Sequence, residues 1–176
     1  MASFNKLSFE LDLGFVKLGG DLSDQDRQCA WEFYSEIATR VAVVGKRGDK
    51  KAVNFDGELF ADSLDSLYTF FKEARSIMRR FPVGRIKDFR QEHLGILINR
   101  ILANVLRTFL DRWNGSYRAW WAQAMKVGGS QFDVQKSFPD LDKFLADWTE
   151  LRLMMRRVER VVAKQYKLVP LDELSS

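Results

Sequence analysis

Apolar side chains recur every three or four residues over several long stretches, and this spacing constrains the fold more than any other feature. The strongest stripe runs from Leu94 through Ile101 to Trp113. Such a period places apolar side chains on one face of an α-helix, and that face must be buried against another element. The helices predicted in this way cover residues 23–44, 62–81, 90–114, 116–127 and 139–167.

Local signals mark several helix ends. Ser23, followed three residues later by Asp26, approximates a capping box at the start of the first helix. Asn114-Gly115 either ends the third helix or kinks it, because residues 116–127 again show helical spacing. Pro139 suits the first turn of the last helix, where a missing backbone N–H costs nothing.

A different pattern, of period two, occupies the first segment, residues 1–20. Leu7, Phe9 and Leu11 alternate with polar residues there, which predicts a half-buried β-strand. A single strand leaves its peptide groups unpaired, so it needs a partner. The candidates are the short alternation at residues 52–55, or a strand of another molecule.

The predicted fold class is therefore mainly α. Amphipathic helices with one apolar stripe each bury those stripes against one another most simply in a bundle. We expect a single domain, residues 1–176, that forms a four-to-five-helix bundle with a short N-terminal β-strand or hairpin. A parallel α/β sheet is disfavoured, because it needs several strands.

Length and composition agree with a folded domain in the cytoplasm. A chain of 176 residues with 46% hydrophobic residues has the size and core of one domain, and it is not a disordered or low-complexity chain. No apolar run approaches the roughly 18 residues of a membrane span. No apolar segment of a signal peptide follows the N-terminus. We therefore expect no membrane partner. The net charge of +4 does not by itself indicate nucleic acid.

The residues that usually carry catalysis are sparse. His93, the single histidine, lies near Asp88 and Glu92 and could serve as a general base, but a surface position at a helix start is favoured. The single cysteine, Cys29, has no nearby histidine and is expected to be buried as a small hydrophobe. The charged loop at residues 45–51 lacks the spacing of a phosphate-binding loop. We expect no enzyme activity, no cofactor and no metal site.

Basic residues form two stripes at helical spacing, one on the last helix and one on the second helix and its connector. The stripe residues are Lys72, Arg75, Arg79, Arg80, Arg85, Arg152, Arg156, Arg160 and Lys164. Two such stripes on neighbouring helices would attract phosphate groups. The alternative, a solvated bundle exterior, is favoured because no recognisable DNA- or RNA-reading module accompanies the charges.

Aromatic residues crowd around the end of the third predicted helix. The cluster consists of Trp113, Tyr117, Trp120 and Trp121. Adjacent Trp120 and Trp121 project about 100° apart on a helix, so at least one tends outward. Tryptophan is enriched at protein interfaces, which makes this cluster a candidate protein interface. The equally weighted alternative is that the short helix packs across the bundle end and buries both.

Residues 30–41, 66–71 and 102–113 read AWEFYSEIATRV, SLYTFF and LANVLRTFLDRW. Together these stretches resemble a group of uncharacterised bacterial helical proteins, with similarity over about residues 23–168. The group has no established activity, so the resemblance implies no catalytic residue. It implies a bacterial cytosolic bundle, and it is compatible with a role in antiviral defence or in a regulatory assembly.

The expected function is a non-enzymatic protein–protein interaction or assembly module of a bacterial cytosolic complex. Its partner would be a second copy of the chain or another protein. The expectation depends on the sparse chemistry, on the aromatic cluster and on a strand that lacks a partner. The alternative is a nucleic-acid-binding regulator that uses the basic helix faces.

Overall fold

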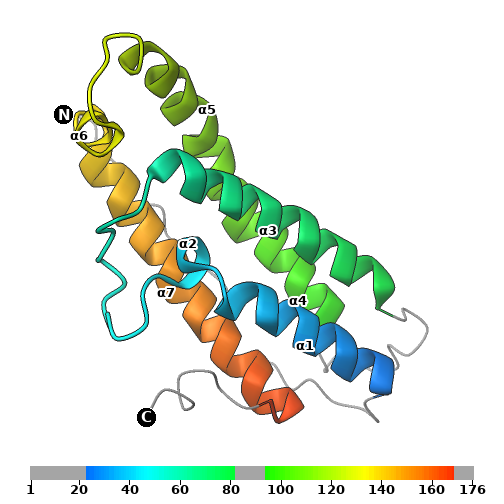
Figure 1. Ribbon diagram of the computed structural model, residues 1–176. Coiled ribbons are helices and arrows are strands. Elements are labelled where there is room, and N and C mark those ends of the chain that lie inside the picture. The colour runs from blue at the N-terminus through cyan, green and yellow to red at the C-terminus, as the bar shows by residue number, and fades with distance from the viewer. Residues whose placement is uncertain (1–22, 82–93, 169–176) are drawn as a thin grey trace, which may run out of the picture.

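Four long helical segments lie side by side in the computed structural model, which describes residues 23–81 and 94–168 (Figure 1). The elements are α1 (Asp24–Ala38), α2 (Val41–Val44), α3 (Phe60–Arg80), α4 (Leu94–Arg100), η2 (Ile101–Leu106), α5 (Arg107–Ala124), α6 (Gln131–Gln135) and α7 (Leu141–Tyr166). The mainly α prediction is confirmed. The predicted N-terminal strand, residues 1–20, lies outside the described residues. Within them there is no β-strand, and the candidate pairing segment 52–55 is irregular.

The long segments pack as a bundle, and successive segments run in opposite directions (Figure 1). α1 packs against both α3 and α7. The segment from α4 to α5 packs against α3, and α5 also packs against α7. α3 and α7 therefore stand at diagonal corners. The two basic stripes were predicted on neighbouring helices, but the bundle separates them.

Aromatic side chains fill the core where α3, α5 and α7 meet. Phe144 of α7 is fully buried at the centre of this group. Its ring centroid lies within about 5.0–6.1 Å of those of Phe60, Phe109, Trp113, Tyr117, Phe138 and Trp148. Burial of a phenylalanine side chain contributes about 1.5–3 kcal/mol, so these contacts dominate the packing at this end of the bundle.

The first predicted helix begins as expected but is interrupted. Ser23 and Asp26 form the capping box: the Asp26 N–H donates to Ser23 Oγ, and the Ser23 N–H donates to Asp26 Oδ2. The helix predicted over 23–44 is split after Ala38, because Arg40 is extended and the Thr39 hydroxyl donates to the Ser35 carbonyl. Four residues of α2 then follow, held by Trp148 Nε1, which donates to the Ala42 carbonyl at 2.8 Å.

The prediction of two helices at 90–114 and 116–127 is wrong, because the described residues form one helical run from Leu94 to Ala124. Asn114-Gly115 does not interrupt it. Gly115 is exposed, and a methyl group placed there would meet nothing within 4 Å. A glycine inside a helix lowers its stability by only about 1 kcal/mol relative to alanine, and the burial of neighbouring side chains on the opposite face offsets this loss. The run is π-helical at Ile101–Leu106, a winding that periodicity does not reveal.

The other two long helices agree closely with the periodicity. α3 and α7 match the predicted ranges 62–81 and 139–167 to within two residues at each end. Pro139 lies just before α7 rather than in its first turn. Across 23–81 and 94–168, no helix has both the length and the apolar character that crossing a membrane would require.

Candidate functional site

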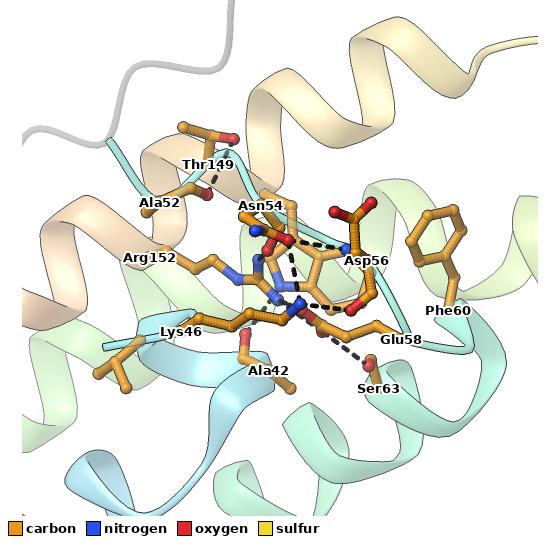
Figure 2. A network of polar contacts seen from close by, with 12 residues as sticks. Ala42, Lys46, Ala52, Asn54, Asp56, Glu58, Phe60, Ser63, Thr149 and Arg152 are labelled. Atoms are coloured by element: carbon orange, nitrogen blue, oxygen red, sulfur yellow. Dashed lines mark hydrogen bonds and ion pairs between the residues drawn. The ribbon is translucent and has the colours of Figure 1, made fainter. Parts of the chain in front are cut away.

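The connection between α2 and α3, residues 45–59, lies against α7 and is held there by two arginines, Arg152 and Arg156. Figure 2 shows Arg152 among the residues of this connection. Arg152 is fully buried, and its Nη2 donates to both carboxylate oxygens of Glu58, at 2.8 and 2.6 Å. The guanidinium carbon also lies 4.0 Å from the ring centroid of Phe55. Burial lowers the pKa of Arg152, while the nearby Glu58 carboxylate opposes the shift.

Further polar contacts fix the same connection from several sides (Figure 2). Lys46 Nζ donates to Asn54 Oδ1 and to the carbonyl of Asp56. Gln135 of α6 donates to the Glu58 carbonyl at 2.9 Å and accepts from the Phe60 N–H at 3.0 Å. The short helix α6, in a segment where no helix was predicted, thereby contacts the start of α3.

Arg156, one turn beyond Arg152, binds the first part of the connection. Its three guanidinium nitrogens donate to the carbonyls of Val44, Lys46 and Asp49, at 2.5, 2.9 and 2.6 Å. Burial lowers the pKa of Arg156. Asp49 and Glu159 oppose that shift, and the positive charges of Arg47 and Arg160 add to it. Arg156 is therefore a positioning residue, because each of its guanidinium nitrogens already donates to the backbone of the connection.

Asp49 closes the turn within this segment. Its carboxylate accepts from the N–H of Asn54 at 2.7 Å and from the N–H of Lys51 at 3.1 Å. These backbone donors, with that of Asn54 contributing most, lower the pKa of Asp49. Carboxylates that accept several N–H bonds hold a loop in one conformation. The backbone around Asp49 is thus held in one conformation.

A hollow of about 480 Å³ opens between residues 44–50 and one face of α7. We call it the basic hollow. Its charged lining residues are Arg47, Asp49, Lys50, Arg156, Arg157, Glu159 and Arg160. Arg47 pairs with Glu159 at 3.0 Å. Lys50, Arg157 and Arg160 are exposed, and none of them forms an ion pair with another described residue. The lining therefore keeps a net positive charge after the ion pair within it is taken into account.

The predicted basic residues differ in their exposure to solvent. Arg152 is buried and cannot belong to a binding surface, because the 45–59 connection covers it. On α7, Arg160 and Lys164 are exposed. On α3, Lys72, Arg75, Arg79 and Arg80 are exposed, and Arg80 pairs with Glu32. Arg85 and His93 lie outside the described residues.

The aromatic cluster is divided in the same way. Trp113 and Tyr117 are buried in the core of the chain, so they are not available to a partner. Trp113 Nε1 donates to Asp147 Oδ2 at 2.9 Å. Trp120 and Trp121 are partly buried against Tyr117 and keep some exposed surface. Cys29 is buried, as predicted, and burial raises the pKa of its thiol.

Sequence reasoning did not select Arg47, Lys50 or Arg157 as site residues. The charged run at 45–51 lacks the spacing of a phosphate-binding loop, and its sequence alone predicts no binding role. The signal that could have found the site is the spacing of Arg157 and Arg160, which share a helix face three residues apart. Only the fold places that face beside Arg47 and Lys50.

Comparison with protein-family models, curated proteins and solved structures finds no match to this chain. Within the described ranges, no group of three or more His, Cys, Asp or Glu side chains is arranged to hold a metal ion. The geometry of the basic hollow is therefore the main guide to function.

Proposed function

We propose that this protein is a non-enzymatic interaction module of a bacterial cytosolic complex, and that it recruits an anionic partner through the basic hollow. One observation carries the proposal: Lys50, Arg157 and Arg160 line one hollow, and none of them forms an ion pair with a described residue. Like charges held together repel one another, and an anion relieves that repulsion. The proposal keeps the expected interaction role and moves its surface from the aromatic cluster to the basic hollow.

The rigidity of the loop supports a binding role. Arg156 and Asp49 hold the backbone of the segment that contains Arg47 and Lys50. This backbone therefore loses little conformational freedom when a partner binds. The exposed cations on the rim would also steer an anionic partner, and this attraction weakens as salt is added.

The test compares two double charge reversals that change the net charge equally. Arg157→Glu/Arg160→Glu alters the basic hollow, and Lys72→Glu/Arg75→Glu alters the diagonal helix α3. Retention of the full chain on immobilised heparin is measured as the salt concentration at elution. We expect the hollow variant to elute at clearly lower salt than the α3 variant. Equal elution of the two would show that only net charge matters and would refute the proposal.

Assembly through the end of α5 is a second candidate, favoured by the partial exposure of Trp120 and Trp121. Exposed tryptophan surface is typical of interface hot spots. Light scattering and sedimentation of the pure protein test it, with Trp120→Ala/Trp121→Ala as the variant. An oligomer that dissociates in this variant would support assembly. A monomer over the measured concentration range would refute it.

A further inference from the structure

We infer that the ligand group of the basic hollow is a phosphate monoester, carried by a nucleotide or by the phosphorylated end of a nucleic acid. This inference rests on the proposed function and goes beyond it by naming the chemistry that the hollow recognises. The charge of the lining, the placement of its donors and the size of the hollow support it.

The charge of the lining calls for an anion with more than one negative charge. Both carboxylates are engaged: Glu159 pairs with Arg47, and Asp49 accepts backbone N–H groups. The cations of Lys50, Arg157 and Arg160 remain unneutralised. A carboxylate or a phosphodiester carries a single charge, whereas a phosphate monoester carries about −1.5 to −2 at neutral pH.

The donors also suit phosphate oxygens. Arg157 and Arg160 lie three residues apart on α7, so their guanidinium groups lie on one side of the hollow. Lys50 approaches from the loop on the other side. A guanidinium group donates two parallel hydrogen bonds to phosphate, while an ammonium group acts as a point charge. A phosphate group, with three terminal oxygens, can accept from both sides at once.

The dimensions point to an organic phosphate rather than to a bare ion. A volume of about 480 Å³ falls within the range of about 300–1,000 Å³ typical of small-molecule sites. Leu153, which is partly exposed, lines the hollow beside the cations and offers apolar surface to the rest of the ligand. Because the cations of the lining are exposed to solvent, the end of an oligonucleotide can reach them as well as a free nucleotide.

The test uses the full chain and defined probes in calorimetric titrations at low salt. Adenosine 5′-monophosphate is compared with adenosine, and a 5′-phosphorylated oligonucleotide is compared with the same oligonucleotide without its phosphate. We expect the phosphorylated member of at least one pair to bind more tightly than its unphosphorylated control. Binding of the nucleotide alone would assign a free ligand, and selective binding of the phosphorylated oligonucleotide would assign a chain end.

Variants and pH supply independent readouts. Arg157→Gln/Arg160→Gln should weaken phosphate-dependent binding by roughly tenfold or more, because two charge-assisted donors are lost. Lys72→Gln/Arg75→Gln on α3 should leave it unchanged. Affinity should also rise between about pH 5 and pH 7, as the second ionisation of the monoester near pH 6 completes the dianion.

Two results would overturn the inference. One is equal binding of phosphorylated and unphosphorylated probes. The other is phosphate-dependent binding that the hollow variant does not weaken. If retention on heparin still depends on the hollow in either case, the proposed anionic interaction stands and only the phosphate monoester is excluded.

Discussion

Arg152 and Glu58 form a buried, doubly hydrogen-bonded ion pair that joins the middle of α7 to the connection leading into α3. Both contacts run from Arg152 Nη2, at 2.8 and 2.6 Å, and the Arg152 side chain has no exposed surface. Its Nε is buried and has no hydrogen-bond partner in the described part of the chain. The pair thus anchors the end of the connection that leads into α3, while Arg156 anchors the part that lines the basic hollow.

Replacing Glu58 by Ala should destabilise the fold by about 3–5 kcal/mol, because it leaves the buried guanidinium of Arg152 uncompensated. Urea unfolding followed by circular dichroism gives the change in unfolding free energy. The matched control is Glu36→Ala, which removes a more exposed ion pair with Arg40 and should cost about 0–1 kcal/mol. Equal losses in the two variants would contradict the special role of the buried pair.

Gly45→Ala should destabilise the protein by about 1–3 kcal/mol, for two reasons that act together. Gly45 adopts φ 72° and ψ −177°, a region essentially restricted to glycine. An added Cβ would also lie 3.2 Å from both Arg152 Cδ and Arg156 Nη2. Thermal and urea unfolding measure the loss.

Gly48→Ala separates the two causes. Gly48 also has a positive φ, of 87°, but an added Cβ would meet nothing within 4 Å. Its substitution should therefore cost less than that of Gly45. A larger loss at Gly48 would show that crowding against the arginines is unimportant.

The helices could be predicted because their signal is local. The apolar stripes of α3 and α7 repeat over many turns, and a single residue out of phase does not erase such a pattern. The break predicted at Asn114-Gly115 is wrong because the glycine lowers only the local stability of the helix. The burial of Trp113 and Tyr117 on the other helix face decides whether the helix continues.

The candidate site could not be predicted, because its parts are distant in sequence. Arg152, Arg156 and Arg160 share one face of α7, but spacing does not reveal that the connection covers the first and engages the second. The contact between Arg156 and Val44 spans 112 residues. Long-range contacts of this kind depend on how the bundle packs, so the basic stripe was predicted as one uniform surface.

Trp113→Phe and Tyr117→Phe should have different effects on stability in the same aromatic core. Tyr117→Phe removes only a hydroxyl, whereas Trp113→Phe removes an indole N–H and part of a buried ring system. Trp113 Nε1 donates to the buried carboxylate of Asp147, so its loss should cost about 1.5–3 kcal/mol. The Tyr117 hydroxyl is buried without a hydrogen-bond partner among the described residues. Its removal should be neutral or stabilising.

Urea unfolding of the two single variants measures these effects. A loss of stability in Tyr117→Phe as large as that in Trp113→Phe would show that the tyrosine hydroxyl has a partner in solution. Burial raises the pKa of Tyr117 well above its ordinary value, so the hydroxyl stays protonated throughout these measurements.

Asp49→Asn should lower stability at neutral pH, and the difference from the original protein should shrink in acid. The hydrogen bonds from Asn54 and Lys51 lower the pKa of Asp49 below its ordinary value of 3.8. The ionised carboxylate therefore stabilises the folded chain above that pH. This contribution is lost as the pH falls through the lowered pKa, where both side chains are neutral.

Unfolding free energies of both proteins, measured from neutral pH to below pH 3.8, give this difference directly. Amide exchange at Asn54 provides a local readout, because its N–H would lose a charged acceptor and should exchange faster in Asp49→Asn at neutral pH. Nucleotide binding should weaken along with it, since Lys50 would no longer be fixed. A stability difference that stays constant with pH would mean that the carboxylate does not hold the loop in its charged form.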